Sequence, residues 1–135
     1  MLFRSAPDKK NININIGEEK TFENFTISIK PADIAAISID KEKSHEFISA
    51  DHILNEKFVV RNWKNGDKFY PLGMKGTKKI ADFLNELKIE SHKKKNQLLL
   101  LNGNKIVWVI GYRLDDRFKI TKNTKNYLEL CLKTA

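Results

Sequence analysis

The chain has 135 residues, of which 41% are hydrophobic, so it can bury one core in a single domain or in two closely packed sub-lobes. No apolar run approaches the roughly 20 residues that span a bilayer, and no secretion-type apolar segment follows the basic start, which excludes membrane-spanning and exported classes. The only cysteine, Cys131, cannot form an internal disulfide, which fits a reducing compartment such as the cytoplasm.

Positive charge is concentrated in the middle of the chain. Residues 57–95 carry 11 Lys/Arg and 4 Asp/Glu, a net charge of +7, whereas the whole chain has +8. Residues 1–56 have a net charge of −3 and residues 96–135 have +4. Segregated basic charge favours a polyanionic partner, because binding of Lys and Arg to phosphate chains releases counterions. The charge alone leaves the kind of polyanion open.

The first third of the chain predicts β structure. Residues 12–16 and 25–29 each alternate apolar and polar side chains, which is the period of two that half-buried strands show. Gly17 lies in the polar connection, so we predict that these two segments form a hairpin. Apolar residues within 34–39 predict a further short strand, which ends at the charged segment 40–46.

The centre predicts a strand at residues 58–63, a turn at 64–67 and then one amphipathic helix. The helix follows from the i, i+3, i+4, i+7 spacing of its apolar residues, and Thr77 is its expected N-cap. The buried face of this helix should comprise Ile80, Phe83, Leu84 and Leu87.

Lys78 and Lys79 would lie in the first turn of that helix, where the positive end of the macrodipole disfavours cations. Helix stability therefore does not account for them. Free N–H groups at a helix N-terminus, preceded by Gly73 and Gly76 and flanked by lysines, suit a bound phosphate. A solvated basic face, with glycines that only permit a tight turn, is an equally good interpretation.

The last third again predicts strands. Asn102-Gly103 is a hairpin signal, and residues 105–112 are too apolar for a strand with one wet face, so Trp108 should lie in the core. The fold class is therefore α+β, a β-rich mixed domain with one helix. The other elements expected here are a strand at 98–101, a charged turn at 113–117, a short strand at 118–121, and a last strand with Leu128, Leu130 and Leu132 inward.

Catalytic and metal-binding signatures are absent from the sequence. It contains no P-loop, GxSxG or HExxH motif and no paired Cys or His spacing suited to zinc. Cys131 has no His near it in sequence, so we expect an incidental thiol. No catalytic residue, cofactor site or metal site is predicted. Turn residues Asp67, Asp115 and Asp116 should bond the local backbone, and His45, His52 and His92 should lie at the surface.

Two segments, VVRNWKNGDKFYPLGMKGTKKIADFLNELKI and NGNKIVWVIGYRLDDRFKIT, resemble the C-terminal region of the bacterial tRNA(Ile)-lysidine synthetases. They cover residues 59–121, and residues 50–54 are similar to the preceding segment of that family. The shared pattern includes Arg61, Gly66-Asp67, Pro71-Leu72-Gly73-Met74, Lys79 leading into a helix with Asp82, the IVWV strand, and Gly111 followed by Arg113, an acidic pair and a basic-aromatic step.

The resemblance implies a fold also seen in a bacterial phenylalanyl-tRNA synthetase subunit. It implies a parent enzyme, an ATP-dependent carbon–nitrogen ligase that attaches lysine to the anticodon wobble cytidine of tRNA(Ile). The SGGxDS-type ATP loop of the catalytic half is absent from this sequence. We therefore expect a non-catalytic C-terminal part, with ATP and Mg²⁺ held by the catalytic domain. The implied partners are tRNA(Ile), mainly its acceptor stem, and that catalytic domain; a homodimer stays open.

We expect a hairpin-rich portion, residues 1–56, packed on a tRNA-binding domain, residues 57–135. Such a domain should position RNA by its backbone and shape, because the A-form major groove is too deep and narrow for side chains to read. Trp63 could stack on an exposed end base, but packing in the core or at its edge is the favoured interpretation for a Trp on a strand. The predicted phosphate contacts are Lys75, Lys78 and Lys79, then Arg61, Lys68, Arg113 and Arg117, with Lys93, Lys94 and Lys95 as an auxiliary strip where many family members carry arginines.

Three other classes rank below RNA binding. A protein-interaction or dimerisation module would use its apolar strand edges, and its affinity would depend only weakly on salt. A membrane-surface binder would need an apolar helix face that is free for insertion, whereas the face within residues 80–87 is needed against the sheet. A free-standing hydrolase would need a nucleophile and a base that the sequence does not offer.

Overall fold

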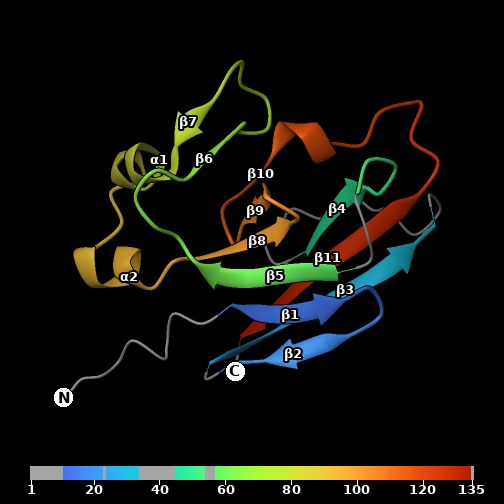
Figure 1. Cartoon of the computed structure of the whole chain (residues 1–135), viewed down its shortest axis with the longest axis horizontal. Coiled ribbons are helices and arrows are strands. Elements are labelled where there is room, and N and C mark those ends of the chain that lie inside the picture. Colours follow the sequence, from blue (N-terminus) through green and yellow to red (C-terminus); the bar gives the residue numbers. More distant parts are fainter. Residues whose placement is uncertain (1–10, 23, 34–44, 54–56, 135) are drawn as a thin grey trace.

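The computed structural model describes residues 11–22, 24–33, 45–53 and 57–134. These residues form three layers (Figure 1): a four-stranded sheet, a five-stranded sheet, and a lobe made of a two-stranded ribbon and two short helices. The architecture is the β-rich α+β fold that the sequence predicts. No helix within the described residues is long and apolar enough to cross a membrane.

The five-stranded sheet is the central layer, and every pairing within it is antiparallel. The strands predicted at 58–63 and 98–101 are confirmed in it, and the strand predicted at 105–112 is present as far as Val109, because residues 110–112 form a turn. The predicted hairpin turn is formed by Gly103 and Asn104, with Gly103 at φ 62°. In spatial order its strands are β1 (Ile12–Asn15), β5 (Lys57–Asn62), β8 (Leu98–Asn102), β9 (Lys105–Val109) and β10 (Arg113–Leu114).

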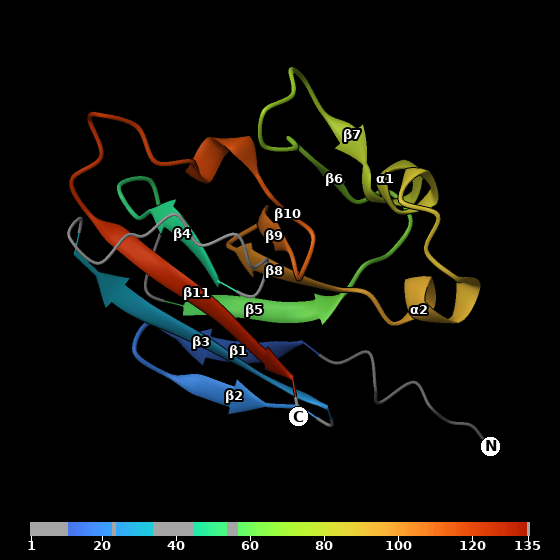
Figure 2. The same ribbon diagram turned by 180° about the vertical axis from the view of Figure 1, so that it is seen from behind.

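The four-stranded sheet lies on one side of the central layer (Figure 2). Its longest pairing joins the last strand to an early one, in register from Tyr127 opposite Ala32 to Thr134 opposite Phe25. The predicted last strand is confirmed, with Leu128 and Leu130 buried and Leu132 half-buried. The strand order is β2 (Glu19–Thr21), β3 (Phe25–Ala32), β11 (Tyr127–Thr134) and β4 (His45–Ser49).

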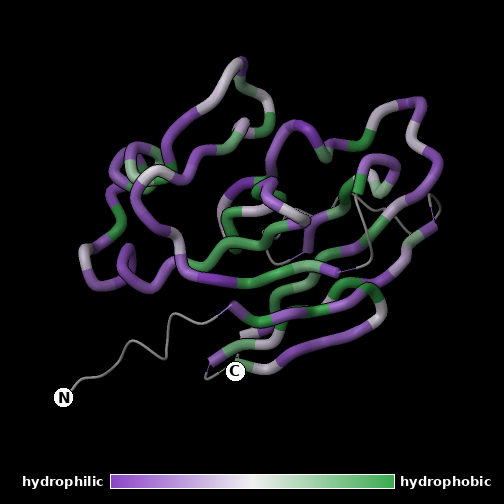
Figure 3. Tube along the Cα trace, in the orientation of Figure 1, coloured by the Kyte–Doolittle hydropathy of each residue, from purple (hydrophilic) through white to green (hydrophobic). Residues whose placement is uncertain are grey.

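Two apolar clusters hold the layers together. Between the sheets, Phe58 and Trp108 from the central layer pack with residues such as Ile29 and Leu130 from the other sheet. On the opposite face of the central layer, residues such as Leu99 and Val109 pack with Phe69 and Phe83 of the lobe to form the second cluster. Strands β8 and β9 are therefore buried on both faces, as was predicted for the segment that contains β9, and they are among the most apolar segments in Figure 3.

The lobe consists of β6 (Lys68–Phe69), β7 (Lys78–Lys79), α1 (Ile80–Glu86) and α2 (Ser91–Lys95). The predicted turn at 64–67 is present, because the Asp67 N–H donates to the Lys64 carbonyl at 3.1 Å. Phe69 and Phe83 meet edge to face with ring centroids 5.1 Å apart, which fixes the ribbon on the helix.

The predicted hairpin between residues 12–16 and 25–29 is wrong. Strand β1 pairs with β5, whereas β3 pairs with β2, a short strand that the sequence pattern did not reveal because its residues Glu19–Thr21 are polar. The reversal lies instead between β2 and β3, where the Phe22 N–H donates to the Phe25 carbonyl at 2.7 Å and the two rings stack at 4.9 Å.

The predicted start of the helix is also wrong. Lys78 and Lys79 are extended and pair with β6, so the helix begins at Ile80, with Lys79 rather than Thr77 at the N-cap. The Ile80 N–H donates to the Asp67 carbonyl at 2.9 Å. The first turn carries Asp82 and no lysine, which agrees with the macrodipole. The geometric basis for a phosphate seat at this helix terminus is therefore lost.

Smaller differences concern the ends and the types of other elements. Leu87 is the C-cap of α1 and is 39% exposed, because the helix stops before its expected fourth apolar position. The charged turn expected at 113–117 contains strand β10 and the start of a 3₁₀ helix, η3 (Asp116–Phe118). The short strand expected at 118–121 is wrong, because Phe118 ends η3 and residues 119–121 have no regular structure. Strand β4 and helix α2 lack a clear apolar period and were not predicted. The strand expected within 34–39 falls outside the described residues.

Leu84 and Leu87 offer a matched test of this helix boundary. Leu84→Ala should lower the free energy of unfolding by about 2–5 kcal/mol, because it leaves a cavity in the second cluster. Leu87→Ala should lower it by about 0.5 kcal/mol or less, as is usual for an exposed side chain. Urea unfolding followed by tryptophan fluorescence measures both. Equal losses for the two variants would contradict the boundary at Glu86.

Candidate nucleic-acid interface

Two lysines of the ribbon stand directly opposite each other. Lys68 on β6 and Lys79 on β7 are register partners, and both are exposed. Opposed side chains of an antiparallel pair are about 4.5–5.5 Å apart at Cβ, and like charges there are destabilising. Lys75, also exposed, lies on the loop that joins the two strands. We call Lys68, Lys75 and Lys79 the ribbon lysines; an anion bound beside Lys68 and Lys79 would relieve the repulsion between those two.

Lys78 differs from its neighbours because its charge is compensated. Its register partner is Phe69, which is fully buried, and its ammonium group is paired with the Glu86 carboxylate across helix α1. The Lys78 side chain is only 19% exposed. It joins the ribbon to the helix.

Arg61 is similarly committed to the protein. Its Nη1 and Nη2 atoms each donate to an Asp67 oxygen at 2.9 Å, and Nη1 also donates to the Asn62 carbonyl. Burial raises the pKa of the Asp67 carboxyl, but hydrogen bonds from Arg61 and from the Lys64 N–H, with the charge of Arg61, outweigh burial and hold that pKa below its usual range. Asp67 thus has the structural role that its turn position predicts.

Asp115 organises the base of the ribbon. Its carboxylate is fully buried and accepts hydrogen bonds from the Tyr70 N–H at 2.9 Å and the Arg117 N–H at 2.8 Å. It also accepts from Nε and Nη2 of the Arg117 guanidinium at 2.9 and 3.0 Å. The same guanidinium lies 4.4 Å from the centre of the Tyr70 ring. Arg117 is therefore held in one orientation beside the ribbon, with 34% of its side chain exposed.

The remaining predicted residues are divided between the layers. The Arg113 guanidinium donates to the Leu72 carbonyl at 3.4 Å and lies 5.7 Å from the centre of the Phe83 ring.

The three lysines of α2 lie at the edge of the lobe. The Lys94 ammonium donates to the Asn85 side chain at 2.8 Å, and the Lys94 carbonyl accepts from the Trp63 indole N–H at 2.6 Å. Trp63 is half-buried against the second cluster, so its predicted edge-packing role is confirmed. On α2, Lys93 lies 4.0 Å from Glu90; Lys95, whose carbonyl accepts from Asn62 at 2.9 Å, completes the strip.

Sequence reasoning missed a second basic segment beside the ribbon. Residues 117–125 carry Arg117, Lys119, Lys122 and Lys125 and no acidic residue. Asp116, which precedes this segment, accepts a hydrogen bond from the Gly73 N–H of the ribbon loop at 3.3 Å. A charge count in a shorter window would have found the segment, because its contribution is diluted over residues 96–135.

Cys131 has a histidine neighbour that the sequence order conceals. Pairing of β11 with β4 places His45 opposite Cys131, with 3.7 Å between Nε2 and Sγ. His45 Nδ1 is 2.8 Å from a Glu129 carboxylate oxygen. The thiol is buried. Within the described residues, no three His, Cys, Asp or Glu side chains are grouped in a way that suits a metal ion.

A family model described as the TilS substrate C-terminal domain matches residues 58–130, and the chain belongs to this family. Its curated relatives are tRNA(Ile)-lysidine synthases. The chain is 44% identical to that of Clostridium tetani over 137 residues, covering 96% of this chain and 29% of the relative. The Parabacteroides distasonis enzyme is 37% identical over 82% of this chain and 24% of its own length. The chain thus spans about a quarter of these relatives.

A solved structure has the same fold. The crystal structure of a TILS C-terminal domain superposes with a TM-score of 0.77, at 16% identity, over 93% of this chain and 98% of the other. The family resemblance read from the sequence is therefore confirmed, and with it the expected fold class.

The Arg61–Asp67 pair should make stability depend on pH in the acid range. Because the folded-state pKa of Asp67 lies below its unfolded value of about 3.9, the stabilisation is present above that value and is lost as pH falls through the folded-state pKa. The difference in unfolding free energy between wild type and Asp67→Asn should shrink from pH 6 to pH 2.5. Urea titrations at each pH measure it, with Asp33→Asn, an exposed position outside the helices, as the control. A difference that is constant with pH would contradict the role of this pair.

Proposed function

We propose that this chain is the part of a tRNA(Ile)-lysidine synthase that holds the tRNA, chiefly its acceptor stem, in the cytoplasm. In this proposal, the catalytic domain of the same protein binds ATP and Mg²⁺ and attaches lysine to the anticodon cytidine. The observation that carries the proposal is the opposition of Lys68 and Lys79 on an exposed ribbon. Its electrostatic cost is recovered when a phosphate backbone lies along the ribbon.

Within this proposal the basic residues have different roles. The ribbon lysines contact phosphates directly, and Arg117, which Asp115 orients, is a further contact beside them. Arg61 and Lys78, whose paired side chains are only 14% and 19% exposed, and Arg113, which lies against the Phe83 ring, support the lobe from within, whereas Arg117 keeps 34% of its side chain exposed. The lysines of α2 add positive potential near the RNA. Such contacts recognise the shape and charge of an A-form stem more than its base sequence.

The family relationship supports RNA as the polyanion. Relatives that carry this region are named tRNA(Ile)-lysidine synthases, and the basic lobe falls within the matched residues 58–130. A docking site for another protein would not need opposed lysines, and its affinity would vary little with salt. The salt dependence of binding therefore separates the two classes.

Changing the ribbon lysines to glutamine should weaken binding of an acceptor-stem minihelix roughly tenfold or more and lower the slope of log Kd against log salt by about 3 units. Fluorescence anisotropy over a series of salt concentrations measures both quantities. An anticodon hairpin of the same length should bind more weakly than the minihelix to the wild-type chain.

A control variant carries the same charge change on the other side of the molecule. Lys20, Lys30 and Lys133 lie on β2, β3 and β11 of the four-stranded sheet (Figure 2), and their change to glutamine should leave most of the affinity. Equal losses in the two triple variants would refute a specific ribbon interface. Equal affinity for the two RNAs would refute the acceptor stem, and salt-independent binding would indicate a protein partner.

A further inference from the structure

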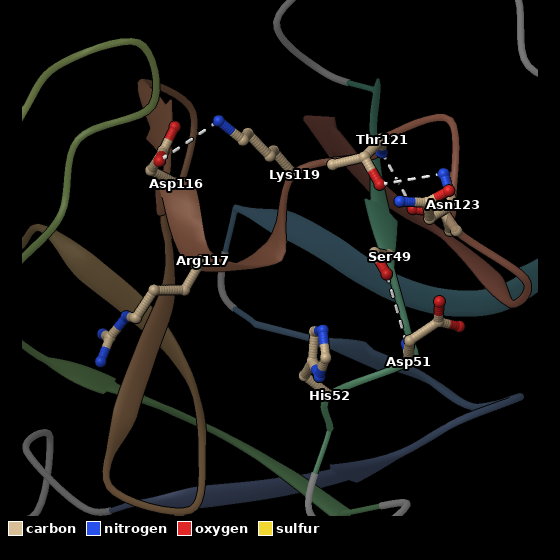
Figure 4. A pocket seen from close by; sticks show the side chains of 9 residues that line it. Ser49, Asp51, His52, Asp116, Arg117, Lys119, Thr121 and Asn123 are labelled. Atoms are coloured by element: carbon tan, nitrogen blue, oxygen red, sulfur yellow. Dashed lines mark hydrogen bonds and ion pairs between the residues drawn. The ribbon is translucent and has the colours of Figure 1, made fainter.

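A polar pocket of about 310 Å³ lies beside the second basic segment (Figure 4). One wall is the end of β4 and the turn after it, with Ser49, Asp51 and His52. The other wall is the stretch from Asp116 to Thr124. In Figure 4 the His52 ring and the Thr121 and Ser49 hydroxyls lie around the same space, and the Lys119 side chain extends away from these hydroxyls toward Asp116. None of the pocket's residues except Arg117 was predicted to bind RNA.

The two carboxylates that line this pocket already accept hydrogen bonds from backbone N–H groups. The two Asp51 oxygens accept from the backbone N–H groups of Lys125 and Asn126 at 2.9 and 2.8 Å. These hydrogen bonds hold the pKa of the Asp51 carboxyl below its usual range. Asp116 accepts from the Gly73 N–H and lies 3.5 Å from the Lys119 ammonium. Both carboxylates therefore fix the backbone around the pocket.

Three hydroxyl groups of the pocket accept hydrogen bonds and have O–H protons that are available for a ligand. Ser49 Oγ accepts from the Asp51 N–H at 3.3 Å, Thr121 Oγ1 from the Asn123 N–H at 3.2 Å, and Thr124 Oγ1 from the Thr121 N–H at 2.9 Å. A hydroxyl has one proton to donate, and within the described chain none of these three donates to a protein acceptor. The pocket wall thus presents O–H donors, and the Lys119 side chain, which is 51% exposed and whose ammonium lies 3.5 Å from Asp116, lines the pocket beside them.

We propose that this pocket binds a phosphate group. Several convergent donors with one or more cations suit a tetrahedral oxyanion, which has acceptor oxygens on every side. Of the four basic residues in the segment 117–125, Arg117 and Lys119 line the pocket, and the segment has no acidic residue. Asp116 ties the pocket to the ribbon loop through Gly73, so a polyanion on the ribbon lysines passes near the pocket. The phosphate is then one of the bound RNA, which rests on the function proposed above, or it is free inorganic phosphate.

Titration of the ¹⁵N-labelled chain with inorganic phosphate, at ionic strength held constant with chloride, tests the site directly. The amide signals of Ser49, Thr121 and Thr124 should shift together. Lys119→Gln and Thr121→Val should each weaken phosphate binding roughly tenfold, since each removes one hydrogen-bond donor to a charged group. Lys122→Gln makes the same charge change in the same segment but outside the pocket lining, and should change binding less than about twofold.

RNA ligands identify the source of the phosphate. A minihelix with a 5′-monophosphate and the same RNA with a 5′-hydroxyl are compared on wild type, Lys119→Gln and Lys122→Gln. A terminal phosphate in the pocket gives the monophosphate an advantage that Lys119→Gln abolishes. An internal phosphate makes Lys119→Gln weaken both RNAs equally. Loss of inorganic phosphate binding alone, with both RNAs unaffected, assigns the pocket to free phosphate.

The proposal is overturned if phosphate shifts none of these amides, or if Lys119→Gln has no larger effect than Lys122→Gln on phosphate and on both RNAs. Its failure is distinguishable from failure of the proposed function. The ribbon variant, in which Lys68, Lys75 and Lys79 are glutamine, should lose RNA affinity but retain inorganic phosphate binding. If that variant keeps its RNA affinity while the pocket still binds phosphate, the ribbon interface is refuted and the pocket stands.

Discussion

Burial of the central sheet on both faces is the constraint on which the rest of the structure depends. Strands β8 and β9 have apolar side chains on both sides, so each face requires a covering layer. The four-stranded sheet covers one face, and the ribbon with α1 covers the other. A ribbon of two-residue strands is too short to be stable alone. It persists because Phe69 and Phe83 are anchored in the second cluster.

The same packing determines which basic side chains of the lobe are paired with carboxylates and which remain on the surface. Cations that are drawn toward the apolar cluster acquire partners, as Arg61 does with Asp67 and Arg117 does with the buried Asp115. A buried carboxylate without such donors would be costly, so these pairs are tied to the fold. The lysines that remain on the outer side of the ribbon are held by a rigid support although they repel each other. A stable support and an electrostatically frustrated surface therefore coexist within a few residues.

The elements could be predicted from the sequence where burial of apolar side chains determines the structure. They could not be predicted where hydrogen bonds between distant segments determine it. The central strands and the inward positions Ile80, Phe83 and Leu84 followed from hydrophobic period alone. The pairing of β1 did not, because an alternating strand shows which face is buried but not which neighbour it joins. The predicted start of the helix was wrong because Lys78 and Lys79 pair with β6 through backbone hydrogen bonds. Backbone pairing of this kind cannot be recognised from the types of the side chains.

The candidate site shows the same limit. Composition located the basic lobe and the lysines on it, whereas the partners of Arg61, Lys78 and Arg117 depend on residues brought close by folding. The pocket was not foreseen for that reason. Its two walls come from positions 49–52 and 116–124, and the bonds from Asp51 to the backbone of Lys125 and Asn126 join them across more than 70 positions.

Two neighbouring carboxylates, Asp115 and Asp116, each accept a backbone N–H from the segment that begins at β6, at Tyr70 and at Gly73. The ribbon and the phosphate pocket are therefore fixed to one short stretch of chain, and their separation is set by the protein before any ligand arrives. The fixed separation of the two sites therefore selects a ligand by the spacing of its phosphates. A polyanion whose phosphates match that separation engages both sites at once, and the second contact forms at high effective concentration. A flexible chain of equal charge lacks the matching spacing, so selection follows from rigidity rather than from charge density.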